Sequence, residues 1–279
     1  MEKWADLHIH TFYSDSTSSP EEVLKQARGC DISCIAITDH DTIAGIAPTQ
    51  QLAVEYGIEV ITGIEFSSEL NGRDIHILGY LFDSQHPILL KQLEHIQDMR
   101  IDRMKKMILR LKEMNVADID FDEVAALTKS RSVGRLHLAT ILLKYGKVAT
   151  IKQAFDKYLA DSAPVYVADL KPTPFEIIEL IHQAGGISVL AHPMIANIDE
   201  LIPQFVEAGL RGIEVYYPNT AEVVIEHYAR IAQKHQLYLT GGSDAHGSVK
   251  KNTFIGRLKI PYELVEKLKS FIPASNGNF

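Results

Sequence analysis

Two histidines near the start of the chain have the type and spacing that could hold a metal ion. The segment Asp6-Leu7-His8-Ile9-His10 alternates polar and apolar residues as a strand does, so side chains two apart share a face. The imidazoles of His8 and His10 are therefore expected side by side, where each neutral ring can offer a nitrogen lone pair to one ion. In a chain with 12 histidines, chance would supply such a pair roughly half the time. The pair alone decides nothing and has to be judged with the rest of the chain.

Further side chains of metal-ligand type occur where the other predicted strands end. They are His40 and Glu65 after the second and third strands, His192, Asp244 and His246 after later strands, Asp15 in the loop after the first strand, and His76 within a strand. The carboxyl ends of parallel strands meet at one rim of an α/β fold. Nine such ligands at one rim favour a polynuclear metal site over chance packing. His182, His227 and His235 fall on predicted helix surfaces and receive no role.

The residue types restrict the metal and the reaction. Imidazole and carboxylate ligands without thiolate suit Mn, Fe or Zn. Glu65 could bridge two ions through its two carboxylate oxygens. Two or three divalent ions held close together are typical of hydrolysis, because they polarise a phosphoryl group, generate hydroxide near neutral pH and stabilise the leaving oxygen.

Strands alternating with helices must position these residues. Strands are expected at 4–9, 33–37, 58–61, 74–81, 187–191, 212–216 and 237–240, and helices at 20–29, up to about 56, 175–184, 198–208, 221–235 and from about 262. Asn71-Gly72 is typical of a hairpin turn. This alternation predicts a mostly parallel sheet or a barrel.

The segment 89–165 has a different pattern. Its apolar residues recur at intervals of three and four, which predicts a long amphipathic helix followed by helices near 121–128, 135–145 and 150–159. It carries 14 Lys and Arg against 10 Asp and Glu, a net +4, so the remainder of the chain, at net −8 overall, carries −12. We interpret residues 89–165 as a helical insertion that caps the substrate, between barrel segments 1–88 and 166–279. A basic cap over an acidic site would suit an anionic substrate, although solvated Lys and Arg on an outer helix face would give the same charge.

Bulk properties exclude several classes of protein. A net charge of −8 argues against a protein that coats DNA. No apolar run reaches the roughly 18 residues that a membrane span needs, and no secretory signal is recognisable. The two cysteines form no disulfide framework or thiolate zinc signature, which predicts a reducing, cytoplasmic location.

The order of the motifs resembles that of one known family. D-L-H-I-H-T-x-x-S-D, T-D-H-D-T, G-I-E-F-S, D-I-H-I-L-G-Y, A-H-P and G-S-D-A-H-G follow one another as in the PHP (polymerase and histidinol phosphatase) family. The resemblance implies a distorted (βα)7 TIM-like barrel with up to three metal ions. It implies that the ions have three ligand sets: His8, His10, Glu65 and Asp244; Glu65, His76 and His192; and Asp15, His40 and His246. His40, Glu65, Asp244 and His246 would be the catalytic residues.

The insertion resembles the PHP subgroup of small nucleotide phosphoesterases. The similarity rests on Arg100 and Arg103 in the long helix, on Gly134-Arg135-Leu136-His137 and on A-F-x-x-Y-L at 154–159. It implies that Arg100, Arg103, Arg135 and His137 bind phosphate, since arginine presents a planar fork to phosphate oxygens. The implied substrates are a nucleoside 3′,5′-bisphosphate or short 5′-phosphorylated RNA. Leu136 and Met194 depart from the usual subgroup residues, and a solvated helix face remains the alternative reading of Arg100 and Arg103.

Two other functions remain open at this stage. One is a phosphatase of the histidinol-phosphate type, against which the basic insertion argues. The other is a non-catalytic, metal-stabilised module of a larger complex, against which the complete ligand set argues. We expect a small nucleotide or short oligonucleotide as partner and a monomer or small homo-oligomer.

Overall fold

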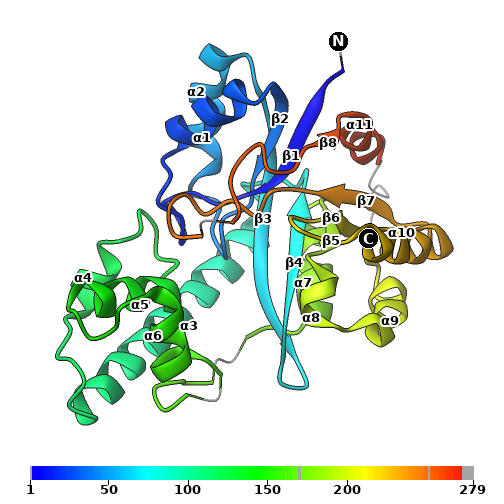
Figure 1. The fold of residues 1–279 in the computed structure, drawn as a ribbon. Helices are drawn as coiled ribbons and strands as arrows, with labels where there is room; N and C mark the ends of the chain where they lie inside the picture. Colours follow the sequence, from blue (N-terminus) through cyan, green and yellow to red (C-terminus); the bar gives the residue numbers. More distant parts are fainter. Residues whose placement is uncertain (1, 162, 169–170, 251, 272–279) are drawn as a thin grey trace.

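The strands lie side by side in one sheet that curls toward a barrel (Figure 1). The computed structural model describes residues 2–161, 163–168, 171–250 and 252–271. Across the sheet these residues place the strands in the order β7-β6-β5-β4-β3-β2-β1-β8. Their bounds are β1 (Trp4–Ile9), β2 (Ile32–Ile37), β3 (Glu59–Leu70), β4 (Arg73–Tyr80), β5 (Ile187–Leu190), β6 (Gly212–Tyr216), β7 (Tyr238–Gly241) and β8 (Ile260–Pro261).

The strand β4 is antiparallel to both of its neighbours, whereas the pairs β1–β2, β2–β3, β5–β6 and β6–β7 are parallel. The predicted turn explains this, because Asn71 and Gly72 have φ angles of 53° and 77° and join β3 directly to β4 as a hairpin. Antiparallel pairing prolongs β3 to Leu70, and Glu65 pairs with Leu78 in mid-strand. The expectation that the third strand ends before Glu65 is therefore wrong.

The sheet closes through the segment that follows β7. Ile9 forms a parallel bridge with Ala245, and the N–H of His10 donates to the carbonyl of Ala245 at 3.0 Å. At this seam a Cβ on Gly242 would lie 2.3 Å from the backbone nitrogen of His8. Glycine is required there because the two backbones approach so closely. The beginning and the end of the barrel thereby meet at the rim that carries the predicted ligands.

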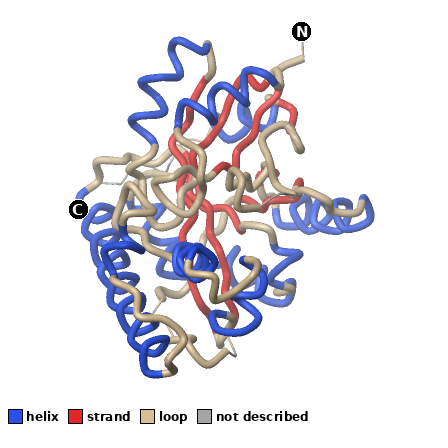
Figure 2. Tube along the Cα trace, turned by 60° about the vertical axis from the view of Figure 1, so that its left-hand side comes forward, coloured by secondary structure: helices blue, strands red, loops and turns tan. Residues whose placement is uncertain are grey.

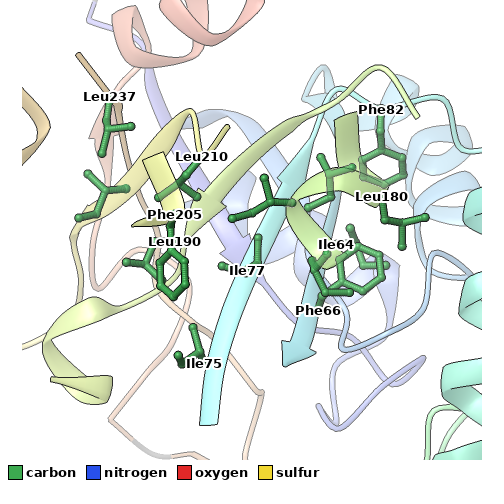
Figure 3. Packing of buried hydrophobic residues seen from close by; sticks show 14 of the residues in the cluster. Ile64, Phe66, Ile75, Ile77, Phe82, Leu180, Leu190, Phe205, Leu210 and Leu237 are labelled. Atoms are coloured by element: carbon green, nitrogen blue, oxygen red, sulfur yellow. The ribbon is translucent and has the colours of Figure 1, made fainter. Parts of the chain in front are cut away.

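Helices cover the outer face of the sheet (Figures 1 and 2). They are α1 (Pro20–Gly29), α2 (Ile46–Tyr56), α7 (Pro174–Gln183), α8 (Pro193–Ala196), the 3-10 helix η2 (Asp199–Leu201), α9 (Ile202–Glu207), α10 (Glu222–His235) and α11 (Glu263–Lys269). Buried side chains join the two layers, as between Ile64 and Ile77 of the hairpin, Leu180 of α7 and Phe205 of α9 (Figure 3). Burial of this apolar surface holds the strand ends in fixed relation to one another.

The segment between β4 and α7 forms a helical lobe beside the sheet (Figure 1). It comprises α3 (Pro87–Glu113), α4 (Phe121–Ala125), α5 (Arg135–Lys144), α6 (Ile151–Ala154) and the π-helix η1 (Phe155–Leu159). The lobe has its own core, to which Met107, Leu138 and Leu159 contribute with no exposed surface. The first turns of α3 pack instead on the barrel core through Leu89 and Leu93. The exact boundaries 89 and 165 stay a prediction, and the predicted barrel segment 166–279 includes residues outside the described ranges.

The predicted α/β TIM-like barrel is confirmed. The helix expected at 198–208 is divided into η2 and α9 near Pro203, whose ring cannot take part in a continuous helix. The two-residue strand β8 was not expected, since so short an element has no measurable period. Among the described residues no helix combines the length and the apolar character needed to cross a membrane.

Candidate metal centre

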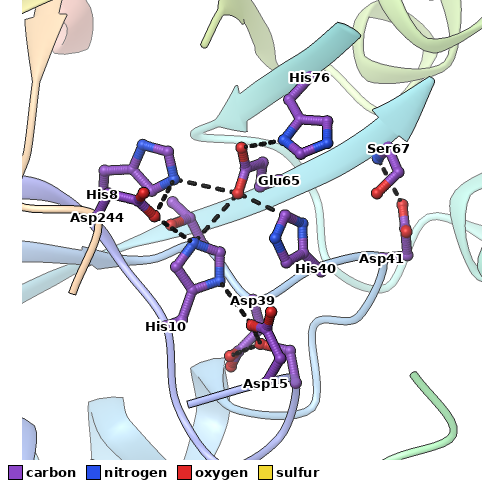
Figure 4. A network of polar contacts seen from close by, with 12 residues as sticks. His8, His10, Asp15, Asp39, His40, Asp41, Glu65, Ser67, His76 and Asp244 are labelled. Carbon is purple, nitrogen blue, oxygen red and sulfur yellow. Dashed lines mark hydrogen bonds and ion pairs between the residues drawn. The ribbon is translucent and has the colours of Figure 1, made fainter. Parts of the chain in front are cut away.

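The carboxylate of Glu65 contacts five imidazole rings, and Figure 4 labels those of His8, His10, His40 and His76 around it. Its Oε2 is 3.1 Å from Nε2 of His8, 3.1 Å from Nε2 of His10 and 3.4 Å from Nδ1 of His40. Its Oε1 is 2.8 Å from Nδ1 of His76 and 2.9 Å from Nε2 of His192. The two oxygens thus face two different groups of rings, which is the arrangement of a carboxylate that could bridge two ions.

All nine predicted ligands lie together at the rim. Three subsets have ligand atoms within 4.8 Å of one another: His8, His10, Glu65 and Asp244; His10, Asp15, His40 and His246; and His40, Glu65 and His76. The first subset has the composition predicted for one ion. The Asp15 subset gains His10, and the His76 subset contains His40 where His192 was expected. His192 is still 2.9 Å from Glu65, so the structure brings it to the same cluster.

The nine side chains differ in burial. His8, His10 and His246 have no exposed surface, and Glu65 and Asp244 have almost none. Side chains of Asp15, His40, His76 and His192 retain 18%, 15%, 21% and 13% exposure. The centre therefore has a closed inner part on the strands and an open outer part that solvent can reach.

Several buried ring nitrogens in this cluster have no hydrogen-bond partner. They are Nδ1 and Nε2 of His10, Nδ1 of His40, Nδ1 of His192 and Nε2 of His246. Buried polar atoms are almost always satisfied, so unsatisfied nitrogens converging on carboxylates fit cations that would take up their lone pairs. The donor set is also suitable, because imidazole and carboxylate are ordinary ligands of Mn, Fe and Zn.

The local electric field also favours cations. Burial lowers the pKa of His10, but the Asp244 and Glu65 carboxylates, 3.2 and 3.1 Å from its Nε2, outweigh burial and raise the pKa to about 9. Burial likewise opposes a charge on His76, yet the nearby Glu65 carboxylate raises its pKa to about 10. Carboxylates that attract protons this strongly would attract a divalent ion for the same reason.

A buried carboxylate behind the cluster, Glu214 of β6, orients two of the rings. Its Oε1 accepts a hydrogen bond from Nδ1 of His8 at 2.9 Å, which leaves Nε2 of His8 directed at Glu65. Its Oε2 accepts the backbone N–H of His192 at 2.8 Å. Outer carboxylates of this kind fix the tautomer and orientation of metal-binding histidines. Sequence reasoning missed Glu214, although a lone carboxylate in the apolar strand G-I-E-V-Y was a signal for it.

Two more buried carboxylates hold the backbone of the ligand loops. Asp6 accepts the N–H of Ser243 at 2.8 Å, and Asp39 accepts the N–H of Thr11 at 2.7 Å. Burial raises the pKa of Asp6 to about 7 and that of Asp39 to about 6, while these hydrogen bonds act in the opposite direction. Neither side chain belongs to the predicted ligand set. Each holds the backbone beside a ligand, since Ser243 precedes Asp244 and Thr11 follows His10.

The backbone is strained at two of the ligands. His192 has a φ of 26° and Asp244 a φ of 48°, in the left-handed region that side chains with a Cβ avoid at a cost of about 1–3 kcal/mol. His192 directly follows β5, and Asp244 follows the seam at Gly242. These residues are held in unfavourable conformations that turn their side chains toward Glu65 and the inner cluster.

A pocket of about 290 Å3 opens between the outer part of the cluster and the helical lobe. Asp15, His40 and His76 line it. Cationic side chains also line the pocket, namely Arg100, Arg103 and Arg135 of the lobe helices together with Lys171 and Lys250. Sequence reasoning missed the two lysines, which lie in loops without any periodic pattern. Lys171 contacts Asp74 at 2.8 Å, and Lys250 contacts Asp244 at 3.3 Å.

The predicted phosphate-binding arginines all line this pocket, in different settings. Arg100 pairs with the buried Asp41 and donates to Oγ of Ser67 at 2.8 Å. Arg103 donates to the carbonyl of Val167 at 2.9 Å. Arg135 pairs with Asp161 and lies over the ring of Phe155, with 5.9 Å between Cζ and the ring centroid.

The fourth residue of that predicted set, His137, lies apart from the pocket. Its Nδ1 accepts the N–H of Gly134 at 2.9 Å, so its Nε2 carries the proton and faces the carbonyl of Ser14 at 2.7 Å. Both nitrogens are used by backbone groups, and the side chain is buried. The structure therefore gives no opening for the expected contact between His137 and phosphate.

Comparisons with known proteins agree with this geometry. The PHP domain family model matches residues 6–240. A 5′-3′ exoribonuclease of Haemophilus influenzae is 36% identical over 255 residues, covering 88% of this chain and 91% of that protein. A 3′,5′-nucleoside bisphosphate phosphatase of Chromobacterium violaceum is 31% identical over 246 residues, covering 86% of each. The crystal structure of a candidate metal-dependent phosphoesterase from Bifidobacterium adolescentis superimposes with a TM-score of 0.88 at 29% identity, covering 96% of this chain and 95% of that one.

Proposed function

Because this chain belongs to the PHP domain family, we propose that it is a metal-dependent hydrolase of nucleotide phosphoesters. The observation that carries the proposal is the pocket that Asp15, His40 and His76 line together with arginine and lysine side chains. A phosphate bound to those cations would lie beside the candidate metal ligands. Its charge would be neutralised from both sides at the point where a phosphoester is cleaved.

We propose that two or three divalent ions, with Mn favoured over Fe or Zn, are held by the three subsets around Glu65. Bound there, such ions would polarise a phosphoester and lower the pKa of water. Glu65 would be shared between ions, since its two oxygens face different rings. Glu214 would keep His8 in the tautomer whose Nε2 is free to bind an ion.

The cationic side chains of the pocket would select the substrate. Arg135 and Lys171 both approach Asp74, at 3.9 and 2.8 Å, so a phosphate entering here would replace a carboxylate as their partner. The apolar side chains of Leu136, Ile151 and Phe155 line the same pocket and could contact a nucleoside. A volume of about 290 Å3 lies at the small end for ligand pockets, which suits one nucleotide at the end of a chain.

The relatives support a nucleotide substrate with two phosphate positions. A nucleoside 3′,5′-bisphosphate and a short 5′-phosphorylated RNA share a terminal 5′ phosphate followed by a phosphoester. One clamp for that terminal phosphate would serve both substrates. The names of the Haemophilus and Chromobacterium proteins correspond to these two activities.

The test is product analysis with protein loaded with Mn2+. We expect release of phosphate from a nucleoside 3′,5′-bisphosphate and release of mononucleotides from 5′-phosphorylated di- to pentanucleotides. His40→Ala should abolish both activities, and His95→Ala, on an exposed face of α3, should leave them intact. Preference for histidinol phosphate would point to the alternative phosphatase. Full metal loading without hydrolysis of any phosphoester would contradict an enzymatic role and favour a metal-stabilised module.

A further inference from the structure

The helical lobe makes close contact with the barrel through residues 128–137, which follow α4 and include the first turn of α5 and which we call the clasp. The clasp runs beside the loop that follows β1 and leads to Asp15, and beside the residue His40 that follows β2. These are two of the candidate ligands in the outer, partly exposed part of the centre. The contacts are made to backbone carbonyls of the ligand loops.

Three consecutive clasp residues hold the loop just before Asp15. The N–H of Lys129 donates to the carbonyl of Phe12 at 2.9 Å. The hydroxyls of Thr128 and Ser130 both donate to the carbonyl of Tyr13, at 2.9 and 2.5 Å. Two donors on one carbonyl fix the peptide plane two residues before the Asp15 side chain.

The next part of the clasp holds His40 itself. The hydroxyl of Ser132 donates to the carbonyl of His40 at 2.5 Å. Ser132 is 2% exposed, and its own N–H donates to Oγ of Ser130 at 2.9 Å. The two serines are therefore linked, so that one short stretch of the lobe fixes the backbone beside both ligands.

His137 completes these contacts at the first turn of α5. Its Nε2–H donates to the carbonyl of Ser14 at 2.7 Å, while its Nδ1 accepts from Gly134 at 2.9 Å. Burial lowers the pKa of His137 and so favours the neutral ring that this pair of contacts needs. The carbonyl of Ser14 belongs to the peptide bond that ends at Asp15.

A buried ion pair anchors the clasp from the other side. Arg100 of α3 donates to the carbonyl of Val133 at 3.2 Å and pairs with Asp41, the residue after His40. Asp41 in turn accepts the N–H of Ser67 at 2.9 Å (Figure 4). The clasp, α3 and β3 are thus tied together around the backbone of His40.

We propose that the clasp is a positioning element of the metal centre that acts through Asp15 and His40, and so on the two ligand subsets that contain them and not on the inner subset. This inference rests on the metal site of the proposed function and adds a role for the lobe besides binding substrate. Outer groups that orient metal ligands contribute about 10–100-fold to metal affinity. The subset His8, His10, Glu65 and Asp244 is held by barrel strands and the seam, without a contact from the clasp in the described residues, and should keep its affinity.

The experiment compares metal binding by purified full-length proteins that differ in single hydroxyl groups. The test variant is Ser130→Ala/Ser132→Ala, with Ser132→Ala alone as a milder change and Ser132→Thr as a conservative variant that keeps the hydroxyl. The matched control is Thr140→Ala, because the Thr140 hydroxyl bonds within α5 to the carbonyl of Leu136 at 2.9 Å. Equilibrium dialysis against Mn2+ with metal analysis gives the number of ions and the affinity of each.

We expect the double variant to bind at least one ion about 10–100-fold less tightly and to keep at least one ion with the affinity of the wild type. At limiting Mn2+ its kcat should fall while its KM for substrate is unchanged, and saturating Mn2+ should restore kcat. Thr140→Ala and Ser132→Thr should follow the wild type. Binding curves identical to wild type for both alanine variants, or equal weakening of every ion, would overturn the proposal. The expected selective loss in a protein that hydrolyses no nucleotide would support the clasp and contradict only the proposed function.

Discussion

The two sides of the pocket are built in different ways. On the barrel side, ligands such as His8, His10 and Glu65 lie in strands or directly after one, are almost fully buried and point at one another over distances near 3 Å. On the lobe side, the cations lie on helices and loops, and most are paired with carboxylates that have other partners. Arg135, for example, is paired with the exposed Asp161, and Lys171 with the half-buried Asp74.

This difference suggests a division of roles, in which the barrel side holds the metal ligands and the lobe side selects the substrate. The buried strands hold the candidate ligands in fixed relation to one another, as catalysis by positioned charges requires. Most cations of the lobe already have a carboxylate partner, so in the proposed function a phosphate would bind by exchanging with a carboxylate. Substrate choice can therefore change by substitution in the lobe while the reaction centre stays the same.

The largest effect should come from the centre of the barrel side. Glu65→Gln removes the only negative charge that contacts all five rings, and the variant should lose metal and at least about a thousandfold in kcat/KM, since ions supply several kcal/mol of charge stabilisation. Metal content and initial rates on a nucleoside 3′,5′-bisphosphate measure this. Glu55→Gln, exposed on α2, is the control. If the Glu65→Gln protein kept its metal and its activity, the barrel side could not be the reaction centre that the comparison assumes.

A smaller loss is expected for the carboxylate behind the rings. Glu214→Gln keeps the shape of the side chain, but its amide cannot accept from both His8 and the backbone of His192, so metal affinity should fall about 10–100-fold. Equilibrium dialysis against Mn2+ gives the affinity, and saturating metal should restore most of the activity. If affinity did not change, the strands alone would be sufficient to orient His8.

On the lobe side, Arg135→Ala should weaken substrate binding and leave metal binding unchanged. A hydrogen bond to a charged group contributes about 1.5–3 kcal/mol, so KM for a nucleoside 3′,5′-bisphosphate should rise about tenfold or more. The effect should be much smaller for a substrate with one phosphate. Lys144→Ala, which removes an exposed charge from the same helix, serves as the control. Loss of metal from Arg135→Ala would show that Arg135 also contributes to the metal centre on the barrel side.

The smallest effect is expected far from both sides. Ser19 caps α1 in a reciprocal arrangement with Glu22, and Ser19→Ala should lower the free energy of unfolding by about 1 kcal/mol. Urea unfolding of the apoprotein measures the change. Steady-state kinetics with Mn2+ should match the wild type, since neither Ser19 nor Glu22 is a candidate metal ligand or a cation of the pocket. A changed kcat would mean that the stability of the outer helices affects the reaction centre.

Much of the barrel side could be predicted from the sequence, because strand ends and ligand residue types coincide. The side-chain alternation in β1 places His8 and His10 on one face, and the structure has them there with ring centroids 5.2 Å apart. The sequence places Glu65 in the correct cluster, but it predicts a position after the third strand, whereas Glu65 lies in the middle of β3. The prolongation of β3 depends on pairing with β4, which is a contact between strands and not a property of either segment.

The contacts on the lobe side could not be predicted from the sequence, for a physical reason. A helical pattern indicates which side chains face outward, but it does not indicate which groups of the barrel those side chains contact. Arg100 and His137 were both expected to bind phosphate, yet Arg100 is engaged with Asp41 and His137 with the carbonyl of Ser14. Lys171 and Lys250 reach the pocket from loops, where sequence has no period from which a direction could be inferred.

The seam of the barrel also determines when the centre can form during synthesis. Asp6 holds the N–H of Ser243 across 237 residues of chain, and the inner subset needs Asp244 as well as His8 and His10. At a synthesis rate of about 5–20 residues per second, the first strand waits roughly 10–50 s for its partners to leave the ribosome. Until then a nascent chain has histidines but no complete inner ligand set, so it should begin to hold metal and to hydrolyse phosphoesters only after nearly the whole barrel has been translated.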